Sequence, residues 1–449
     1  MSPSSERGDL FGHPRGLSYL FATEMWERFS YYGMRALLVL YMVKYLLHPE
    51  HVQTVVGFSA LRGALESVFG PLDMQPLSSQ IFGLYSGLVY LTPVLGGYLA
   101  DRVLGQRRMV IIGASLMAVG HFLMAFETLF LLALLVLILG NGAFKPNIST
   151  QVGALYAPGD PRRDSAFSIF YVGINLGAFL APLVCGTLGE TLGWHYGFGA
   201  AGIGMTIGLS IYLYATRTLP PDPRSRLSAT AEAEPLSHDE WRLIGAIVLL
   251  ALPVVFFWAT YEQQGNTIAL WADGYTERRI GSFEIPTTWF QAVNPFLIFA
   301  FTPVILTLWR RQAARHREPS TVLKMAYGCF GTAAAYLVLA AAATSANGGK
   351  ASALWLLLYF VILTVGELYL SPVGLSLVSK LAPARALSMM MGVWLATSFA
   401  GGFLAGYLGS FWSSMAKDRF FLMIAVIAGV AGLVILAFVR PLKGTLRES

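Results

Sequence analysis

Residues 22–33 read Ala22-Thr-Glu-Met-Trp-Glu-Arg-Phe-Ser-Tyr-Tyr-Gly33, and they lie in a long apolar run over 17–47. A helix of roughly 20 mainly apolar residues crosses a bilayer, and charged side chains inside such a helix are costly and rare. At about 100° per residue, four polar side chains of this run fall within roughly 60° on a helical wheel, and a fifth lies beside them. They are Glu24, Arg28, Tyr31 and Arg35, with Glu27 as the neighbour. This stripe cannot face lipid, so we expect it to face a water-filled cavity or compensating charge.

The composition is that of a polytopic membrane protein. Of the 449 residues, 55% are hydrophobic and only 12% are charged, whereas soluble domains contain about 25% charged residues. The net charge of +6 does not indicate nucleic-acid binding, because the basic residues lie in short loops between apolar runs, where they set topology. Cys185 and Cys329 lie in separate apolar runs without motif spacing, so we expect neither a disulfide nor a metal site.

Twelve apolar runs are long enough to be membrane helices. They lie at 17–47, 80–101, 109–126, 128–150, 165–189, 195–216, 242–272, 287–309, 321–343, 352–379, 386–414 and 419–439. If the N-terminus is inside, the inner loops and both tails hold most of the Lys and Arg residues, so the positive-inside rule places both termini in the cytoplasm. We expect an all-α protein with six-helix bundles at 1–218 and 240–449, joined by a polar cytoplasmic linker at 219–239.

Two six-helix halves with such a linker are the arrangement of the major facilitator superfamily. Residues 97–108, Gly-Tyr-Leu-Ala-Asp-Arg-Val-Leu-Gly-Gln-Arg-Arg, also resemble the superfamily's G-x-x-x-D-R-x-x-G-[RK]-[RK] loop. The glycines permit close packing and a tight turn, and we expect Asp101 and Arg102 to latch neighbouring helix ends. A topogenic loop alone would explain the arginines but not their spacing from the glycines and the aspartate.

Seven charged residues lie well inside the predicted helices, more than three residues from either end, and their signs nearly balance. They are Glu24, Glu27, Glu262 and Glu367, with Arg28, Arg35 and Lys145. Because static buried ion pairs add little net stability, we interpret the set as machinery that binds a charged solute or moves protons. The alternative, a side chain that reaches the headgroups, best suits Lys44 and Arg35.

Five segments resemble the proton-dependent oligopeptide transporter family over essentially the whole chain. Residues 24–33 resemble its E-x-x-E-R-F-x-Y-Y motif, and 167–186 resemble its fifth-helix signature with an F-Y-x-x-I-N-x-G core. Segments 140–147, 257–265 and 366–372 resemble its fourth, seventh and tenth helices. The resemblance implies a proton-coupled symporter that imports di- and tripeptides by alternating access. A nitrate or other small-anion symporter on the same scaffold is the alternative, against which the Glu367 carboxylate argues.

The family resemblance also assigns a peptide site. A peptide is a zwitterion, and by this resemblance Arg28 and Lys145 bind its carboxylate and Glu367 its amine. The remaining assigned residues contact the peptide backbone or side chains: Asn175, Asn294, Arg35, Tyr31, Tyr90, Trp258 and Trp394. Aromatic residues make up 13% of the chain, so packing or interface anchoring is the alternative for each of the four aromatics.

Proton coupling and gating follow from where the charges lie. Glu24, Glu27 and Glu262 are the candidate proton carriers, since making or breaking a pair with a cation such as Arg28 changes a carboxylate's proton affinity. Counting along the helices places Arg35 and Glu262 in the outer half as a predicted outer gate. The same count places Lys145 and Glu367 at or below the midplane as a predicted inner gate.

Other classes of function lack support in the sequence. We find no nucleophile elbow, no metal-ligand spacing and no phosphate-cradling loop, so we do not expect an enzyme. We expect no cofactor beyond protons as the coupling ion, no nucleic-acid partner, and a monomer. The absence of large outer loops favours a bacterial protein, so we expect it in the bacterial inner membrane. A peptide sensor or a structural membrane protein would share the site without needing the proton-coupling acids.

Overall fold

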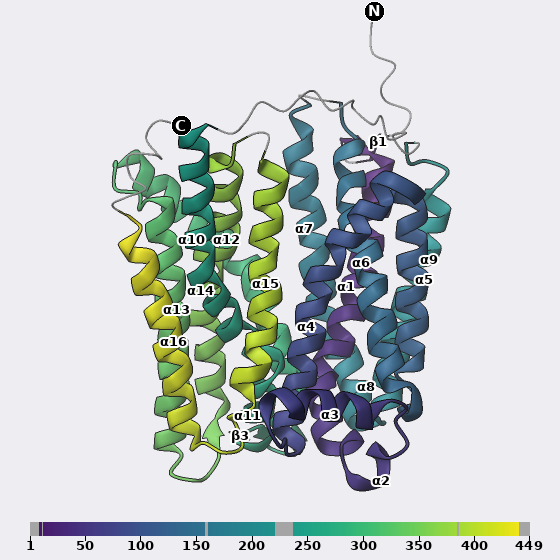
Figure 1. Ribbon diagram of the computed structural model, residues 1–449, viewed down its shortest axis with the longest axis vertical. Coiled ribbons are helices and arrows are strands. Elements are labelled where there is room, and N and C mark those ends of the chain that lie inside the picture. The colour runs from purple at the N-terminus through teal and green to yellow at the C-terminus, as the bar shows by residue number, and fades with distance from the viewer. Residues whose placement is uncertain (1–8, 11, 158–159, 221–236, 384–385, 440–449) are drawn as a thin grey trace, which may run out of the picture. The chain divides into compact units, whose positions relative to one another are not determined.

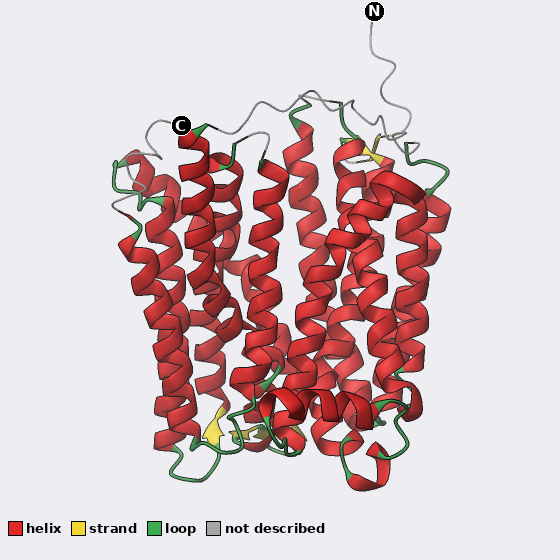
Figure 2. Cartoon of the chain, in the orientation of Figure 1, coloured by secondary structure: helices red, strands yellow, loops and turns green. Residues whose placement is uncertain are grey.

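The computed structural model describes residues 9–10, 12–157, 160–220, 237–383 and 386–439, almost all of them in helices (Figures 1 and 2). The chain divides into two compact units. Unit 1 comprises Met1–Leu61 and Leu91–Ser228, and unit 2 comprises Arg62–Tyr90 and Ala229–Ser449. Residues 62–90 thus group with unit 2. The predicted domain boundaries at 218 and 240 stay a prediction, and most of the predicted linker lies outside the described residues.

Unit 1 is built around the helix that carries the polar stripe. Its main helices are α1 (Arg15–Tyr41), α5 (Gln106–Leu123), α6 (Phe130–Ala154), α7 (Arg162–Ala181) and α9 (Trp194–Ala215). Shorter segments are β1 (Asp9–Leu10), β2 (His13–Pro14), η1 (Met42–Leu46), α2 (Pro49–Val52), η2 (Ala100–Leu104), η3 (Glu127–Leu129), η4 (Pro182–Gly186) and α8 (Thr187–Thr191). Helix α1 packs against α7 and α9, and α5 packs against α6 and α9.

Unit 2 contains the remaining long helices. They are α10 (His238–Tyr261), α12 (Val293–Ala314), α13 (Thr321–Ser345), α14 (Ala353–Leu381), α15 (Leu387–Gly409) and α16 (Lys417–Ala437). Its shorter segments are η5 (Glu262–Gly265), α11 (Thr267–Gly274), η6 (Thr287–Ala292), β3 (Thr276–Glu277), β4 (Arg279–Ile280), β5 (Phe283–Glu284) and β6 (Ala351–Ser352). Strand β3 pairs in parallel with β6, and β4 forms an antiparallel hairpin with β5. Helix α13 packs against α14 and α16 (Figure 1).

Two helices, α3 (Phe58–Phe69) and α4 (Met74–Leu99), extend across the boundary between the units. Helix α3 lies outside the twelve predicted apolar runs. Arg62 Nε donates to Glu66 Oε1 at 2.9 Å, and the Leu72 amide donates to the same oxygen at 3.1 Å. The hydrogen bond from Arg62, followed by that from the Leu72 amide, lowers the pKa of Glu66 from its usual value. These bonds end α3 and turn the chain toward α4.

By length and composition, ten helical segments of the described chain can cross a membrane. The predicted runs 17–47 and 109–126 are also helical, as α1 with η1 and as α5. They are not among the ten, because the charged residues of each lower its hydropathy. The arrangement of twelve helices in two six-helix bundles stays a prediction.

Glycines permit close helix contacts in both units. A Cβ atom on Gly113 of α5 would lie 2.6 Å from the backbone nitrogen of Phe144 in α6. In unit 2, a Cβ on Gly366 of α14 would lie 2.8 Å from the Gly328 carbonyl oxygen of α13, and one on Gly328 would lie 2.7 Å from the Gly366 oxygen. The pairs α5–α6 and α13–α14 therefore meet at glycine seams, where small residues let membrane helices approach closely.

Candidate functional site

Glu24, Glu27 and Arg28 form one buried ion cluster on α1. The Arg28 guanidinium donates to both Glu27 oxygens, with Nη2 2.6 Å from Oε1, and its Nε lies 3.4 Å from Glu24 Oε1. Asn141 of α6 donates to Glu27 Oε1 at 3.4 Å. None of these side chains is more than 4% exposed. Because the surroundings are dry, adding a proton to either carboxylate would change the strength of the whole cluster.

Three further residues of the predicted site lie with this cluster in unit 1. The Arg28 guanidinium lies over the Tyr31 ring, 4.9 Å from its centre. Lys145 of α6 interacts electrostatically with Glu24, and Arg35 is half-buried two turns beyond Arg28. Within the described part of the chain, Glu24 Oε2 is buried without a hydrogen-bond donor. An unsatisfied buried carboxylate oxygen costs stability, which favours a functional reason for keeping it.

Helix α7 approaches the cluster through a glycine. A Cβ on Gly177 would lie 2.2 Å from the Met25 carbonyl oxygen and 3.0 Å from Arg28 Cβ. The predicted site residue Asn175 is buried nearby, and its Nδ2 donates to the Tyr171 carbonyl at 3.0 Å. Gly177 was not among the predicted site residues, although the G-x-x-x-G spacing of Gly173 and Gly177 is a sequence signal for such a close helix contact.

Replacing Gly177 with valine should separate α7 from α1 at the ion cluster. Overpacking a well-packed contact costs about 1–3 kcal/mol, so we expect a lower melting temperature in detergent and a loss of most transport. Gly199→Val in α9 is the matched control, because a Cβ there meets nothing within 4 Å. Equal melting temperatures and equal transport in the two variants would refute this packing role.

A second polar group lies in unit 2 around Glu367 of α14. Asn294 Nδ2 of α12 donates to Glu367 Oε2 at 2.9 Å and is 3.0 Å from Thr364 Oγ1. The Tyr261 hydroxyl donates to Asn294 Oδ1 at 3.4 Å. Glu262 is buried at the start of η5, where α10 tightens into a 3₁₀ turn, and it interacts electrostatically with Glu367. The structure thus brings three predicted residues together and adds Tyr261 and Thr364, which were not among the predicted site residues.

The predicted aromatic residues of unit 2 lie in different surroundings. Trp394 is 5% exposed, and a Cβ on Gly374 of α14 would lie 2.2 Å from its Cη2, so its ring is packed onto that glycine. Trp258 is half-buried and packs edge-to-face with Tyr261 at 5.4 Å. Tyr90 is half-buried on α4. Trp394 therefore has the surroundings of a packing residue, whereas Trp258 and Tyr90 keep part of their surface accessible.

The predicted latch motif runs from the end of α4 through η2 into α5, and the start of α5 contacts the chain beyond α9. Asp101 and Arg102 are exposed in η2, and the Arg102 guanidinium lies 5.6 Å from the centre of the Tyr98 ring. Arg107 Nη2 donates to the carbonyls of Leu219 and Pro220, at 2.6 Å for the latter. An arginine of the predicted latch motif thus holds the start of the predicted linker. The latch role of Asp101 and Arg102 themselves stays a prediction.

The two predicted gate pairs each join residues of different units, Arg35 with Glu262 and Lys145 with Glu367. Both pairings stay predictions.

Cys185 and Cys329 are free and buried. Among the residues described, no group of three His, Cys, Asp or Glu side chains could hold a metal ion.

Comparison with known proteins decides the family. A family model described as the POT family matches residues 107–231 and 228–423. The chain belongs to the POT family. The protein is therefore an integral membrane transporter and not an enzyme.

Two curated relatives and one solved structure are similar to nearly the whole chain. The peptide transporter YePEPT of Yersinia enterocolitica subsp. palearctica serotype O:3 (strain YE-P4) is 35% identical over 89% of this chain and 88% of its own. The di-/tripeptide transporter of Lactococcus lactis subsp. cremoris is 33% identical over 96% of each chain. A crystal structure of a POT family transporter in complex with a thioalcohol conjugated peptide is 28% identical, with a TM-score of 0.83 over 96% of this chain and 97% of the other.

Proposed function

We propose that this POT-family transporter imports di- and tripeptides by alternating access and couples the import to protons. The observation that carries the proposal is the pair of polar groups buried in membrane helices, one built on Arg28 and one on Glu367. A zwitterionic peptide requires a cation for its carboxylate and an anion for its amine. We assign Arg28 and Lys145 to the carboxylate and Glu367 to the amine. The names of two relatives and the ligand of a third support this substrate class.

The α1 cluster is the proposed proton-coupling device. Both Glu27 oxygens accept hydrogen bonds from Arg28, so a proton on Glu27 would cancel the charge that holds the guanidinium. Glu24, 3.4 Å from Arg28 Nε, would then be the one carboxylate of the cluster still paired with Arg28, whose Nη2 could bind the carboxylate of the peptide. Glu24 and Glu262 are the further proton carriers in this scheme. One proton moved inward with a neutral zwitterion gains about 2.3 kcal/mol per 100 mV of membrane potential.

The remaining site residues have supporting roles in the proposal. Asn175 and Asn294 contact the peptide backbone, and Asn294 also orients Glu367, to which it donates. Tyr31, Tyr90, Trp258 and Trp394 provide apolar surface with polar edges, which suits tolerant recognition of side chains. Trp394 would need to move away from Gly374 to contact a peptide, since its ring is packed there.

Two ion pairs are the proposed gates, Arg35 with Glu262 outside and Lys145 with Glu367 inside. Leaving one buried charge unpaired costs about 3–5 kcal/mol, so Arg35→Glu and Glu262→Arg should each lose most uptake. The double variant Arg35→Glu/Glu262→Arg restores the pair with reversed charges and should recover part of the lost uptake. Uptake that stays as low in the double variant as in the single variants would contradict the outer gate.

The charge distribution supports an orientation with both termini in the cytoplasm of a bacterium and the chain in its inner membrane. In this orientation the termini share their side of the membrane with a cluster of four arginines, Arg310, Arg311, Arg315 and Arg317. We also propose that the transporter acts as a monomer. Labelling of an Arg317→Cys variant, but not of the unmodified protein with its buried Cys185 and Cys329, by a membrane-impermeant reagent in intact cells would contradict the orientation.

Uptake of labelled dialanine into proteoliposomes tests the function as a whole. We expect accumulation that requires an inward proton gradient and that unlabelled dipeptide, but not nitrate, inhibits. Inhibition by nitrate at similar concentrations would favour the small-anion alternative. Dialanine binding without transport would indicate a sensor.

A further inference from the structure

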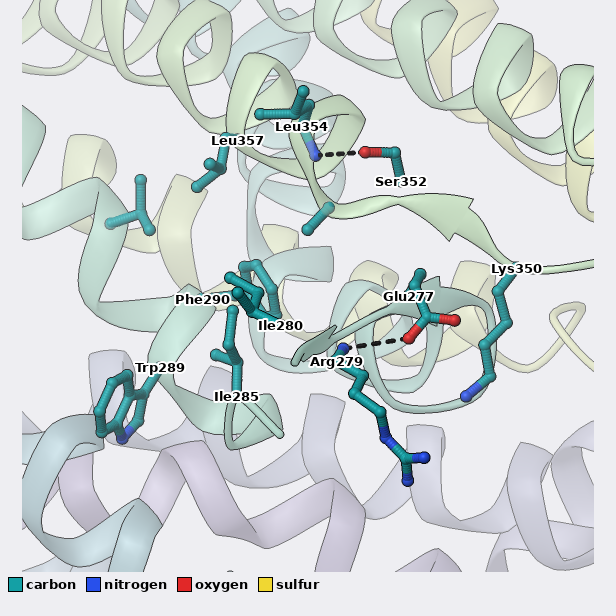
Figure 3. A pocket seen from close by; sticks show the side chains of 12 residues that line it. Glu277, Arg279, Ile280, Ile285, Trp289, Phe290, Lys350, Ser352, Leu354 and Leu357 are labelled. Carbon is teal, nitrogen blue, oxygen red and sulfur yellow. Dashed lines mark hydrogen bonds between the residues drawn. The ribbon is translucent and has the colours of Figure 1, made fainter. Parts of the chain in front are cut away.

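A cavity of about 670 Å³ lies in unit 2 beside the β4–β5 hairpin and the start of α14 (Figure 3). The parallel pairing of β3 with β6 forms one side of it, because Glu277 is in register with Ser352 and the Ala351 amide donates to the Tyr275 carbonyl at 2.8 Å. This pairing fixes Lys350 beside the hairpin. None of the residues proposed to bind peptide lines this cavity.

One side of the cavity is charged. Figure 3 shows Glu277, Arg279 and Lys350 together on that side. The Arg279 side chain is 69% exposed, with Nη2 3.9 Å from Glu284 Oε2, and Glu277 Oε1 accepts from the Arg279 amide at 3.0 Å. Helix α14 begins here at Ala353, and its N-terminus adds positive partial charge. Glu284 lies outside the lining and is held more closely by Arg278, whose Nη2 is 2.8 Å from Glu284 Oε1. Among the lining residues, two cations and the helix end thus face one carboxylate, so this side favours an anionic group.

The other side of the cavity is apolar. Trp289, Phe290 and Leu357 lie there in Figure 3, and Leu354 lies at the edge nearest Ser352. Leu354 is 72% exposed and Leu357 is 37% exposed. Exposed leucines on a membrane-spanning helix contact acyl chains, and tryptophan is enriched at the level of the headgroups. The cavity therefore joins an anion-binding end to a face that meets lipid.

The position of the cavity along the helices assigns it to a leaflet. Helices α12 and α14 both lead from this end of unit 2 toward the end with Arg310, Arg311 and Lys380. That end is cytoplasmic in the proposed orientation, so the cavity faces the outer leaflet. We propose that it binds one phospholipid, with its phosphate on Arg279 and Lys350 and an acyl chain along Leu354, Leu357 and Trp289. Binding itself does not depend on the identity of the transported solute.

Native mass spectrometry of the full-length protein, titrated with phosphatidylglycerol after delipidation, tests the lipid site. Arg279→Ala/Lys350→Ala should weaken the tightest lipid-binding event about tenfold or more, since two charge-assisted contacts to phosphate are lost. Leu357→Trp should weaken the same event by filling the apolar side while all charges remain.

Two matched controls keep the test specific. Arg315→Ala/Arg317→Ala removes the same charge at the other end of the unit, and Leu433→Trp enlarges an exposed leucine on α16. Neither should change the tightest binding event. Cavity variants that bind the lipid as tightly as the controls would overturn the proposal. Displacement of the lipid by an equal concentration of inorganic phosphate would also overturn it, because the cavity would then be a site for a free anion.

Discussion

Replacing Glu27 with glutamine should abolish gradient-driven peptide uptake and leave counterflow exchange measurable. Glu27 is fully buried, and both of its oxygens accept from Arg28. Glutamine keeps the size of the side chain but cannot gain or lose a proton, so the coupled half of the cycle stops. We expect driven uptake to fall about 100-fold or more, the scale of losing a proton-transfer group. Counterflow needs no net proton movement and should fall far less.

Glu127→Gln provides the matched control for this prediction. Glu127 is a carboxylate of the same unit that accepts from the Tyr45 hydroxyl at 2.6 Å, outside the ion cluster. This control variant should retain driven uptake. If Glu27→Gln instead loses driven uptake and counterflow to the same extent, the variant has damaged binding or folding. Driven uptake at the level of the unmodified protein would remove Glu27 from the coupling mechanism.

Replacing Glu367 with alanine should weaken the binding of a dipeptide with a free amine about 10–100-fold. This range corresponds to losing one charge-assisted hydrogen bond in a buried site, about 1.5–3 kcal/mol. An N-acetylated dipeptide lacks the charged amine, so its weaker binding should hardly change in the variant. Lys145→Ala should show the opposite preference. It should lose much affinity for a dipeptide with a free carboxylate and little affinity for the C-terminal amide. Isothermal titration with three ligands, the unmodified dipeptide, its N-acetylated form and its C-terminal amide, measures both effects.

Thr364→Val separates the role of the Glu367 charge from that of its surroundings. Thr364 Oγ1 is 3.0 Å from the same Asn294 amide that donates to Glu367. Valine removes this hydrogen-bond partner without removing charge, so it should weaken the binding of all three ligands slightly and without discrimination. If Glu367→Ala also weakens all ligands alike, the carboxylate is not the amine-binding group.

Sequence periodicity could predict which polar side chains share one helix face. It could predict little about which residues of other helices pack against that face. Glu24 and Arg28 are four residues apart on one helix, so their contact follows from the helical repeat. The Glu27–Asn141 and Asn294–Glu367 contacts join different helices. Such contacts depend on helix packing, which the spacing of residues in one run does not contain.

The hydropathy pattern does not predict helix ends or short elements, for a related reason. The second predicted run began at 80, whereas α4 begins at Met74. Gln75 Nε2 donates to Ser79 Oγ at 2.8 Å and to the Gly409 carbonyl at 3.0 Å, so polar side chains in this first turn find partners in unit 2. Packing of this kind lets a helix extend past its apolar run. The same limit applies to α3, whose apolar residues are interrupted by glycine and charge.

The glycine seam between α13 and α14 determines which amino-acid substitutions this chain can tolerate there. Gly328 and Gly366 carry no charge and donate no side-chain hydrogen bond, but a methyl group on either would lie within 2.8 Å of the other's carbonyl oxygen. Selection would act on volume at these two positions and on charge at Glu27. A complete substitution scan scored by uptake would therefore mark the seam as intolerant alongside Glu27. Intolerant positions in such a scan would trace the helix contacts of the protein as well as the path of its substrate.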